Sequence, residues 1–209
     1  NLYYSEKYGA YYIGDITDFN KNNVVFKEEV AKQDVLQERC ATCKSKKHVY
    51  YDELIGEEGE VVDGNRFDEV ARLEAMTPDE RFAFWQNELS RCIRCNACRD
   101  VCPACTCEKC VFNNPNSGVE NKAASNEFEE KMFHIIRAFH VAGRCTDCGE
   151  CSRVCPQNIP LHLLNRKFIK DINEFYGAFQ AGEDATSPSP LVSYKDSDPE
   201  ADEAVQRRG

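Results

Sequence analysis

The chain of 209 residues contains no apolar run long enough to cross a membrane, and no basic stretch followed by an apolar one opens it. A spanning helix needs about 20 consecutive apolar residues and a secretory signal needs the second pattern, so we expect neither. The expected location is a reducing cytoplasm, where disulfides are rare. The chain begins at Asn1 within ordinary folded sequence, so we expect it to be the C-terminal part of a longer polypeptide.

Positive charge is also scarce, since 26 lysines and arginines face 36 aspartates and glutamates and give a formal net charge of −10. Nucleic-acid binding rests on a basic surface, so we expect no nucleic-acid partner and favour docking onto other proteins. The sequence has no glycine-rich nucleotide fingerprint and no Ser/His/Asp arrangement. Flavin or nicotinamide sites are accordingly expected on partners or in a missing N-terminal part.

Cysteine, in contrast, is abundant, and eight of the 13 cysteines form two copies of the pattern C-x2-C-x2-C-x3-C-P, at residues 92–103 and 145–156. This is the signature of two-cluster ferredoxins, in which three cysteines of each run bind one 4Fe-4S cluster and the fourth binds the other. Three cysteines at this spacing let one tight loop wrap three corners of a cubane. The predicted sets are Cys92, Cys95, Cys98 and Cys155 for one cluster, and Cys102, Cys145, Cys148 and Cys151 for the other.

Zinc knuckles and disulfides are the alternative interpretations of these eight cysteines. Zinc sites pair two C-x2-C units and do not need three cysteines followed by a fourth before proline. A disulfide framework is typical of secreted chains, which this sequence does not resemble. The doubled pattern therefore favours the clusters.

Five further cysteines suggest a third metal site. Cys40-x2-Cys43 and Cys107-x2-Cys110 together make the two-knuckle arrangement of a four-thiolate zinc site. The same four thiolates, or a set in which Cys105 replaces one of them, could instead hold a third 4Fe-4S cluster. The sequence leaves zinc and iron open, with Cys105 as the spare thiol.

The predicted fold class is mainly α, in three parts. Residues 1–60 carry the first C-x2-C half-site, β-like runs at 11–13 and 24–26 and a strand-like stretch at 48–56, as at the end of a larger upstream domain. Residues 61–180 form an α-helical domain that binds two clusters. Residues 181–209 are an acidic, Pro- and Ser-containing extended tail.

Three amphipathic helices are predicted around the motifs. The first follows a capping box at Thr77 and Glu80, the second begins near Asn126 and is capped by Gly143, and the third ends near Gly177. Their expected buried faces are Phe82, Trp85 and Leu89 in the first, Phe128, Met132, Ile135, Ile136 and Phe139 in the second, and Leu161, Leu164, Phe168, Ile172 and Phe175 in the third.

The run CIRCNACRDVCP, joined through a helix to RAFHVAGRCTDCGECSRVCPQNIPLHLLNRKF, resembles the α-helical ferredoxin domain of succinate dehydrogenase, fumarate reductase and heterodisulfide reductase iron-sulfur subunits. The likeness covers about residues 78–176. The runs FWQNELSRCIRCNACRDVCPACTCEKC and ERCATC more closely resemble cytoplasmic dicluster subunits related to the A subunit of anaerobic sulfite reductase. Such subunits accompany hydrogenases, formate dehydrogenases and heterodisulfide-reductase-like flavoproteins of anaerobes.

The resemblance implies an iron-sulfur subunit that relays single electrons between redox partners in a cytoplasmic anaerobic oxidoreductase complex. The alternatives are a catalytic subunit with an open iron, which would need a missing ligand, and a docking subunit with a metal staple. Charged residues near the motifs have two interpretations, because histidines can be ligands or packing residues and arginines can offset thiolate charge or form exposed salt bridges. These residues are His48, His134, His140 and His162, and Arg91, Arg94, Arg99, Arg144 and Arg153.

Overall fold

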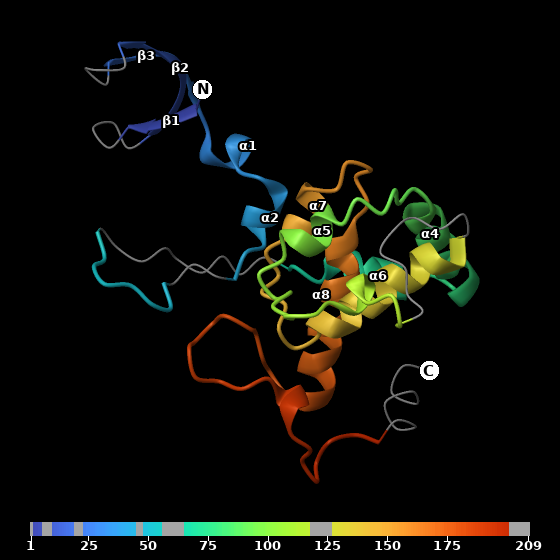
Figure 1. The fold of residues 1–209 in the computed structure, drawn as a ribbon. Coiled ribbons are helices and arrows are strands. Elements are labelled where there is room, and N and C mark those ends of the chain that lie inside the picture. The colour runs from blue at the N-terminus through green and yellow to red at the C-terminus, as the bar shows by residue number, and fades with distance from the viewer. Residues whose placement is uncertain are drawn as a thin grey trace. The chain divides into compact units, whose positions relative to one another are not determined.

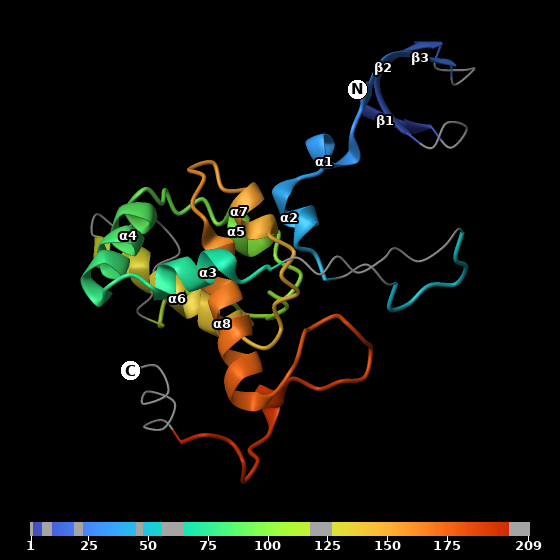
Figure 2. The ribbon, with the colours of Figure 1, turned by 180° about the vertical axis from the view of Figure 1, so that it is seen from behind.

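The computed structural model describes residues 2–5, 10–18, 23–44, 48–55, 65–117 and 127–200 (Figures 1 and 2). The chain divides into two units, Asn1–Thr42 and Cys43–Gly209, and each unit is described by itself. The domain boundaries expected near residues 60 and 180 stay predictions. Among the described helices, none has the length and apolar character that a membrane crossing requires.

The first unit is an antiparallel sheet followed by two short helices. Strands β1 (Leu2–Ser5), β2 (Ala10–Asp18) and β3 (Asn23–Val30) pair in the order β1-β2-β3, and both predicted β-like runs lie in β2 and β3. Helices α1 (Lys32–Val35) and α2 (Glu38–Ala41) follow, and α2 carries Cys40. The strand expected at 48–56 is wrong for residues 48–55, which form none, so aromatic and β-branched composition did not suffice without a partner strand.

The second unit is helical, which confirms the mainly α fold class. Helix α4 contacts α6, α6 contacts α8, and the short α5 and α7 pack against each other (Figures 1 and 2). Its helices are α3 (Asp68–Glu74), α4 (Pro78–Ser90), α5 (Ala97–Asp100), α6 (Glu127–Val141), α7 (Glu150–Arg153) and α8 (Leu161–Tyr176), with 3-10 turns η1 (Val111–Asn113) and η2 (Pro190–Val192).

Helix α4 starts where the sequence predicts. The backbone N–H of Glu80 donates to the Thr77 hydroxyl oxygen at 3.3 Å, and the backbone N–H of Thr77 donates to the Glu80 carboxylate at 2.9 Å. This capping box satisfies two amides that a helix leaves without partners. The helix ends at Ser90, so it delivers the chain directly to Cys92.

The predicted face of α6 is wrong in part. Ile136 packs against the core, but Phe128 is 70% exposed and Phe139 61%, whereas Phe133, His134 and Arg137 are buried. The prediction assumed an apolar interior, but the interior also holds motif cysteines, and Arg137 donates to the Cys98 carbonyl there. In α4, Phe82 is likewise exposed, although Leu89 is buried. In α8 the buried residues are Leu161, Leu163, Asn165, Arg166, Ile169 and Ile172.

The rest of the core is small and surrounds two of the motif cysteines. Leu89, Phe112, Phe133, Ile159 and Leu161 form one buried cluster together with Cys98 and Cys151. After α8 the described chain runs to residue 200 with η2 as its helical turn, which agrees with the expected extended tail; residues 201–209 lie outside the described part.

Candidate metal centres

Four thiols line one cavity of the second unit. They come from both motifs and are Cys92, Cys95, Cys98 and Cys155. In the loop before α5, Arg94 and Asn96 have left-handed backbone conformations, with positive φ values of 49° and 63°. The Arg94 backbone N–H then points back to the Cys92 sulfur at 3.3 Å.

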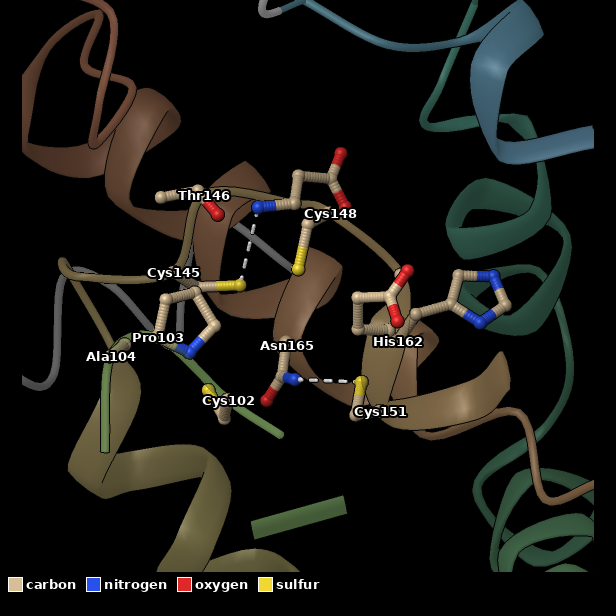
Figure 3. A pocket seen from close by; sticks show the side chains of 12 residues that line it. Cys102, Pro103, Ala104, Cys145, Thr146, Cys148, Cys151, His162 and Asn165 are labelled. Carbon is tan, nitrogen blue, oxygen red and sulfur yellow. Dashed lines mark hydrogen bonds between the residues drawn. The ribbon is translucent and has the colours of Figure 1, made fainter. Parts of the chain in front are cut away.

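Four other thiols line a second cavity (Figure 3). They are Cys102, Cys145, Cys148 and Cys151. Asp147 and Gly149, at the same motif positions as Arg94 and Asn96, also have positive φ values, 56° and 70°. The Asp147 backbone N–H lies 3.5 Å from the Cys145 sulfur, so the two loops repeat one local geometry. Alternating left- and right-handed residues of this kind turn amides inward, which suits an anionic group.

The two cavities contain crossed sets of cysteines. Cys155 of the second motif lines the first cavity, and Cys102 of the first motif lines the second. The pairing of α5 with α7 accompanies this exchange, because each short helix carries the third cysteine of its motif and ends shortly before the fourth. The structure thus brings together the two groups of four that the sequence predicts.

The side chains around both cavities fit 4Fe-4S clusters. His134 is 2% exposed and lines the first cavity, and neither of its ring nitrogens has a protein partner. In the second cavity the Asn165 amide nitrogen lies 3.6 Å from the Cys151 sulfur (Figure 3). Cluster sulfides are acceptors that such buried donors can satisfy.

Burial favours the protonated form of several of these thiols before metal arrives. It raises the pKa of Cys92 and of Cys145 to about 12, and that of Cys151 to about 11. Metal ligation requires thiolates, so loading must expel these protons. In each set one thiol is exposed, Cys95 in the first and Cys148 in the second. The exposed thiols mark where each site comes nearest to solvent.

Arg137 of α6 lies near thiols of both sets. It is 3% exposed, and its Nη2 donates to the Cys98 carbonyl at 2.8 Å. Burial alone would lower its pKa, but the neighbouring sulfurs of Cys98, Cys151 and Cys102 raise it above the usual value. The guanidinium therefore stays charged beside both thiol sets, where it offsets negative charge.

Three buried ion pairs hold the loops. Arg94 Nε donates to Glu130 of α6 at 3.0 Å, with both side chains almost fully buried. Asp147 accepts from Arg166 Nε of α8 at 2.9 Å and lies 3.4 Å from Arg66. The third residue of each motif, Arg94 or Asp147, thus holds its loop to a neighbouring segment through buried ion pairs.

The five remaining cysteines line neither of these two cavities. Cys105, Cys107 and Cys110 line a further cavity of the second unit, of about 290 Å³. Cys40 lies on α2 of the first unit and Cys43 at the start of the second. Their convergence with Cys107 and Cys110 on one metal stays a prediction.

The predicted histidines and arginines have unequal roles. His48 and His140 are exposed, and His162 is half-buried with its Nδ1 2.8 Å from the Ser152 hydroxyl. Arg91, Arg144 and Arg153 are exposed, whereas Arg94 is buried. The sequence did not lead us to Arg137 and Asn165. Each is a charged or amide residue at a position where helical spacing otherwise predicts a buried apolar side chain.

Residues 88–159 match the family model described as a 4Fe-4S dicluster domain. They form a 4Fe-4S dicluster domain. The match includes all eight cysteines of the two cavities, and it confirms the predicted 4Fe-4S cofactors and the resemblance to iron-sulfur electron-transfer proteins.

Two relatives are archaeal. The F420-dependent formate dehydrogenase subunit beta of Methanocaldococcus jannaschii is 30% identical over 104 residues, which are 50% of this chain and 27% of the relative. The F420-dependent formate dehydrogenase 1 subunit beta of Methanococcus maripaludis is 32% identical over 107 residues, 51% of this chain and 26% of the relative. The chain thus spans about a quarter of the length of these relatives.

Proposed function

We propose that this chain relays single electrons between redox partners within an oxidoreductase complex. The observation that carries the proposal is the presence of two cavities, each lined by four cysteines, within one dicluster domain. A bound 4Fe-4S cluster supplies a centre that takes up and gives back one electron at a time. Four thiols per site leave no vacant position for a substrate, which favours relay over catalysis.

The exposed thiol of each set marks the side from which a redox partner can approach that site. Cys95 and Cys148 are the exposed thiols of their sets, while Cys98 and Cys151 are buried near Arg137. Both buried thiols lie near this charged side chain, and the exposed ones face solvent. Electrons would accordingly enter near one exposed thiol and leave near the other, with neighbouring proteins docked at each.

Partners of this kind are other subunits of a redox complex. The formate dehydrogenase beta subunits among the relatives support a formate dehydrogenase as one such complex, and the sequence resemblance adds hydrogenases and heterodisulfide-reductase-like flavoproteins. The net charge of −10 favours partners with basic docking surfaces. We place the complex in the cytoplasm of an anaerobe.

Anaerobic purification followed by metal analysis and a reductive titration tests the proposal. We expect at least about eight irons and eight sulfides per chain, and uptake of at least about two electrons from a low-potential donor such as dithionite. We also expect no turnover of formate by the chain alone. About four irons, or turnover of formate by the chain without partners, would contradict the proposal.

A further inference from the structure

The third cavity lies in a part of the second unit that neither thiol set occupies. Three cysteines in the pattern Cys105-x-Cys107-x2-Cys110 line it. Its volume of about 290 Å³ makes it more spacious than a gap between packed side chains. Cys105 and Cys110 are half-buried and Cys107 is exposed, so this set, like the two others, has one thiol at the surface.

The loop that carries these thiols is held at both ends. The Cys105 backbone N–H donates to the Cys102 carbonyl at 3.0 Å, which ties the loop to the first motif. After Cys110, the buried Phe112 packs on Phe133 with 4.5 Å between the ring centroids. The loop between these anchors has no regular secondary structure, so its backbone is free to curve around a bound group.

Positive charge gathers around the same cavity. Arg99, Arg137 and Arg144 all line it, and Arg99 Nη1 lies 3.9 Å from the Cys110 sulfur. The nearby carboxylate of Asp100 is paired with Arg99 at 2.9 Å. Of these arginines Arg137 is buried, and a buried charge needs compensation, which thiolates bound to metal would provide.

The arrangement of the thiols favours a cluster over a mononuclear ion. Within the described ranges, no three His, Cys, Asp or Glu side chains come close enough together to hold a single metal ion. The same holds for the thiols of the two dicluster cavities, which belong to no such group either. A zinc site would need four ligands drawn in to about 2.3 Å from one atom.

We propose that Cys105, Cys107 and Cys110 bind a third 4Fe-4S cluster, with Cys43 of the same unit as its fourth ligand. Among the described cysteines of that unit, Cys43 is the one that lines none of the three cavities. The loop supplies three thiolates to one cluster, as each dicluster motif does. Cys105 is then a ligand, not the spare thiol that the sequence suggested.

The third site adjoins the second. The Cys105 backbone N–H donates to the carbonyl of Cys102, a residue of the second set, at 3.0 Å. Arg137 lines the third cavity and also donates to Cys98. Neighbouring sites that share a cysteine contact and a cation suit one-electron transfer, in which one site is oxidised as the other is reduced. This role rests on the proposed function, but the binding of the cluster does not.

Iron analysis of the full chain tests the proposal. We expect about twelve irons and twelve sulfides per chain, four for each of three clusters, and about eight in the C107A/C110A variant. Electron paramagnetic resonance (EPR) of the reduced variant should lose the signal of one cluster and keep the signals of two. C43A should weaken the same signal and no other.

Thiol alkylation of the wild-type protein provides a measurement that does not depend on how a variant folds. In loaded protein, iodoacetamide should leave the exposed Cys107 unmodified, and removal of iron by a chelator should expose it to labelling. About eight irons with one zinc, about eight irons with Cys107 labelled, or an unchanged iron content in C107A/C110A would each overturn the third cluster. Those results would leave the electron-relay proposal intact, whereas about four irons would count against that proposal itself.

Discussion

Arg137 donates a hydrogen bond of 2.8 Å from Nη2 to the backbone carbonyl of Cys98, from a side chain that is 3% exposed. The bond fixes the guanidinium beside the short helix α5 (Ala97–Asp100), which carries Cys98. The sulfurs of Cys151 and Cys102, from the other set, also act on its charge. One cation therefore serves both cluster sites.

Replacing Arg137 with glutamine should make both clusters harder to reduce. Loss of a positive charge disfavours the added electron, and we expect midpoint potentials to fall by roughly 50 to 100 mV, equivalent to ~1 to 2 kcal/mol. EPR-monitored redox titration measures this change. R137K should recover most of the potential, because it keeps the charge.

The matched control for Arg137 is R153Q, which removes an exposed arginine of the second motif that is paired with Glu150. Water screens an exposed charge, so the potentials should change little. Equal shifts in R137Q and R153Q would contradict a specific role for Arg137.

The crossed sets predict which cluster each fourth cysteine supports. C102A should damage the cluster of Cys145, Cys148 and Cys151, and leave the other largely intact, because Cys102 lines only the cavity of that set. C155A should have the converse effect on the set of Cys92, Cys95 and Cys98. Mössbauer spectra of the two variants distinguish the clusters. Loss of the cluster of its own motif in either variant would show that the sets do not cross.

The cysteine pattern predicted the two thiol sets before any fold was known, because the spacing of metal ligands is a local property of the chain. The capping box at Thr77 and Glu80 was predictable for the same reason. The face of α6 was not. Hydrophobic periodicity assumes an apolar interior, and here Phe128 and Phe139 face outward while His134 and Arg137 face the thiols.

Other features were hidden because they depend on contacts between distant segments. Arg66 and Arg166 both approach Asp147, although about 80 and about 20 residues separate them from it. Residues 48–55 have a composition that suits a strand, but they pair with no other strand and form none. Strand pairing and buried ion pairs are settled by the tertiary fold, which a single sequence does not display.

Glu74 should give the fold a pH-dependent contribution. Burial alone would raise its pKa, but hydrogen bonds from Lys167 and Lys170 of α8 outweigh that effect and lower it. A carboxyl with a lowered folded-state pKa stabilises the protein above its unfolded pKa of about 4.3, and this stability is lost as the pH falls. Glu74 thereby fastens α3 to α8 at neutral pH.

The E74Q variant measures this contribution. We expect it to be less stable than wild type by about 1 kcal/mol or less at pH 7, and the difference to shrink towards zero below about pH 4. Urea unfolding followed by circular dichroism gives the difference between the two proteins, which carry the same clusters. E108Q, at an exposed glutamate of the Cys107–Cys110 loop, is the control and should show little change. A difference for E74Q that persists in acid would rule out the carboxylate as its source.

The buried pair of Arg94 and Glu130 should matter more than any exposed pair. E130Q leaves the Arg94 guanidinium buried without its counter-charge, 4.2 Å from the centre of the Phe133 ring. Removing one partner of a buried pair costs about 3 to 5 kcal/mol, so the Tm of the loaded protein should fall by roughly 6 to 15 °C. Differential scanning calorimetry under anaerobic conditions measures it. E88Q breaks the exposed pair with Arg91 near the same motif and should lower the Tm by no more than about 3 °C. Similar losses in both variants would mean that burial does not set the strength of the Arg94 pair.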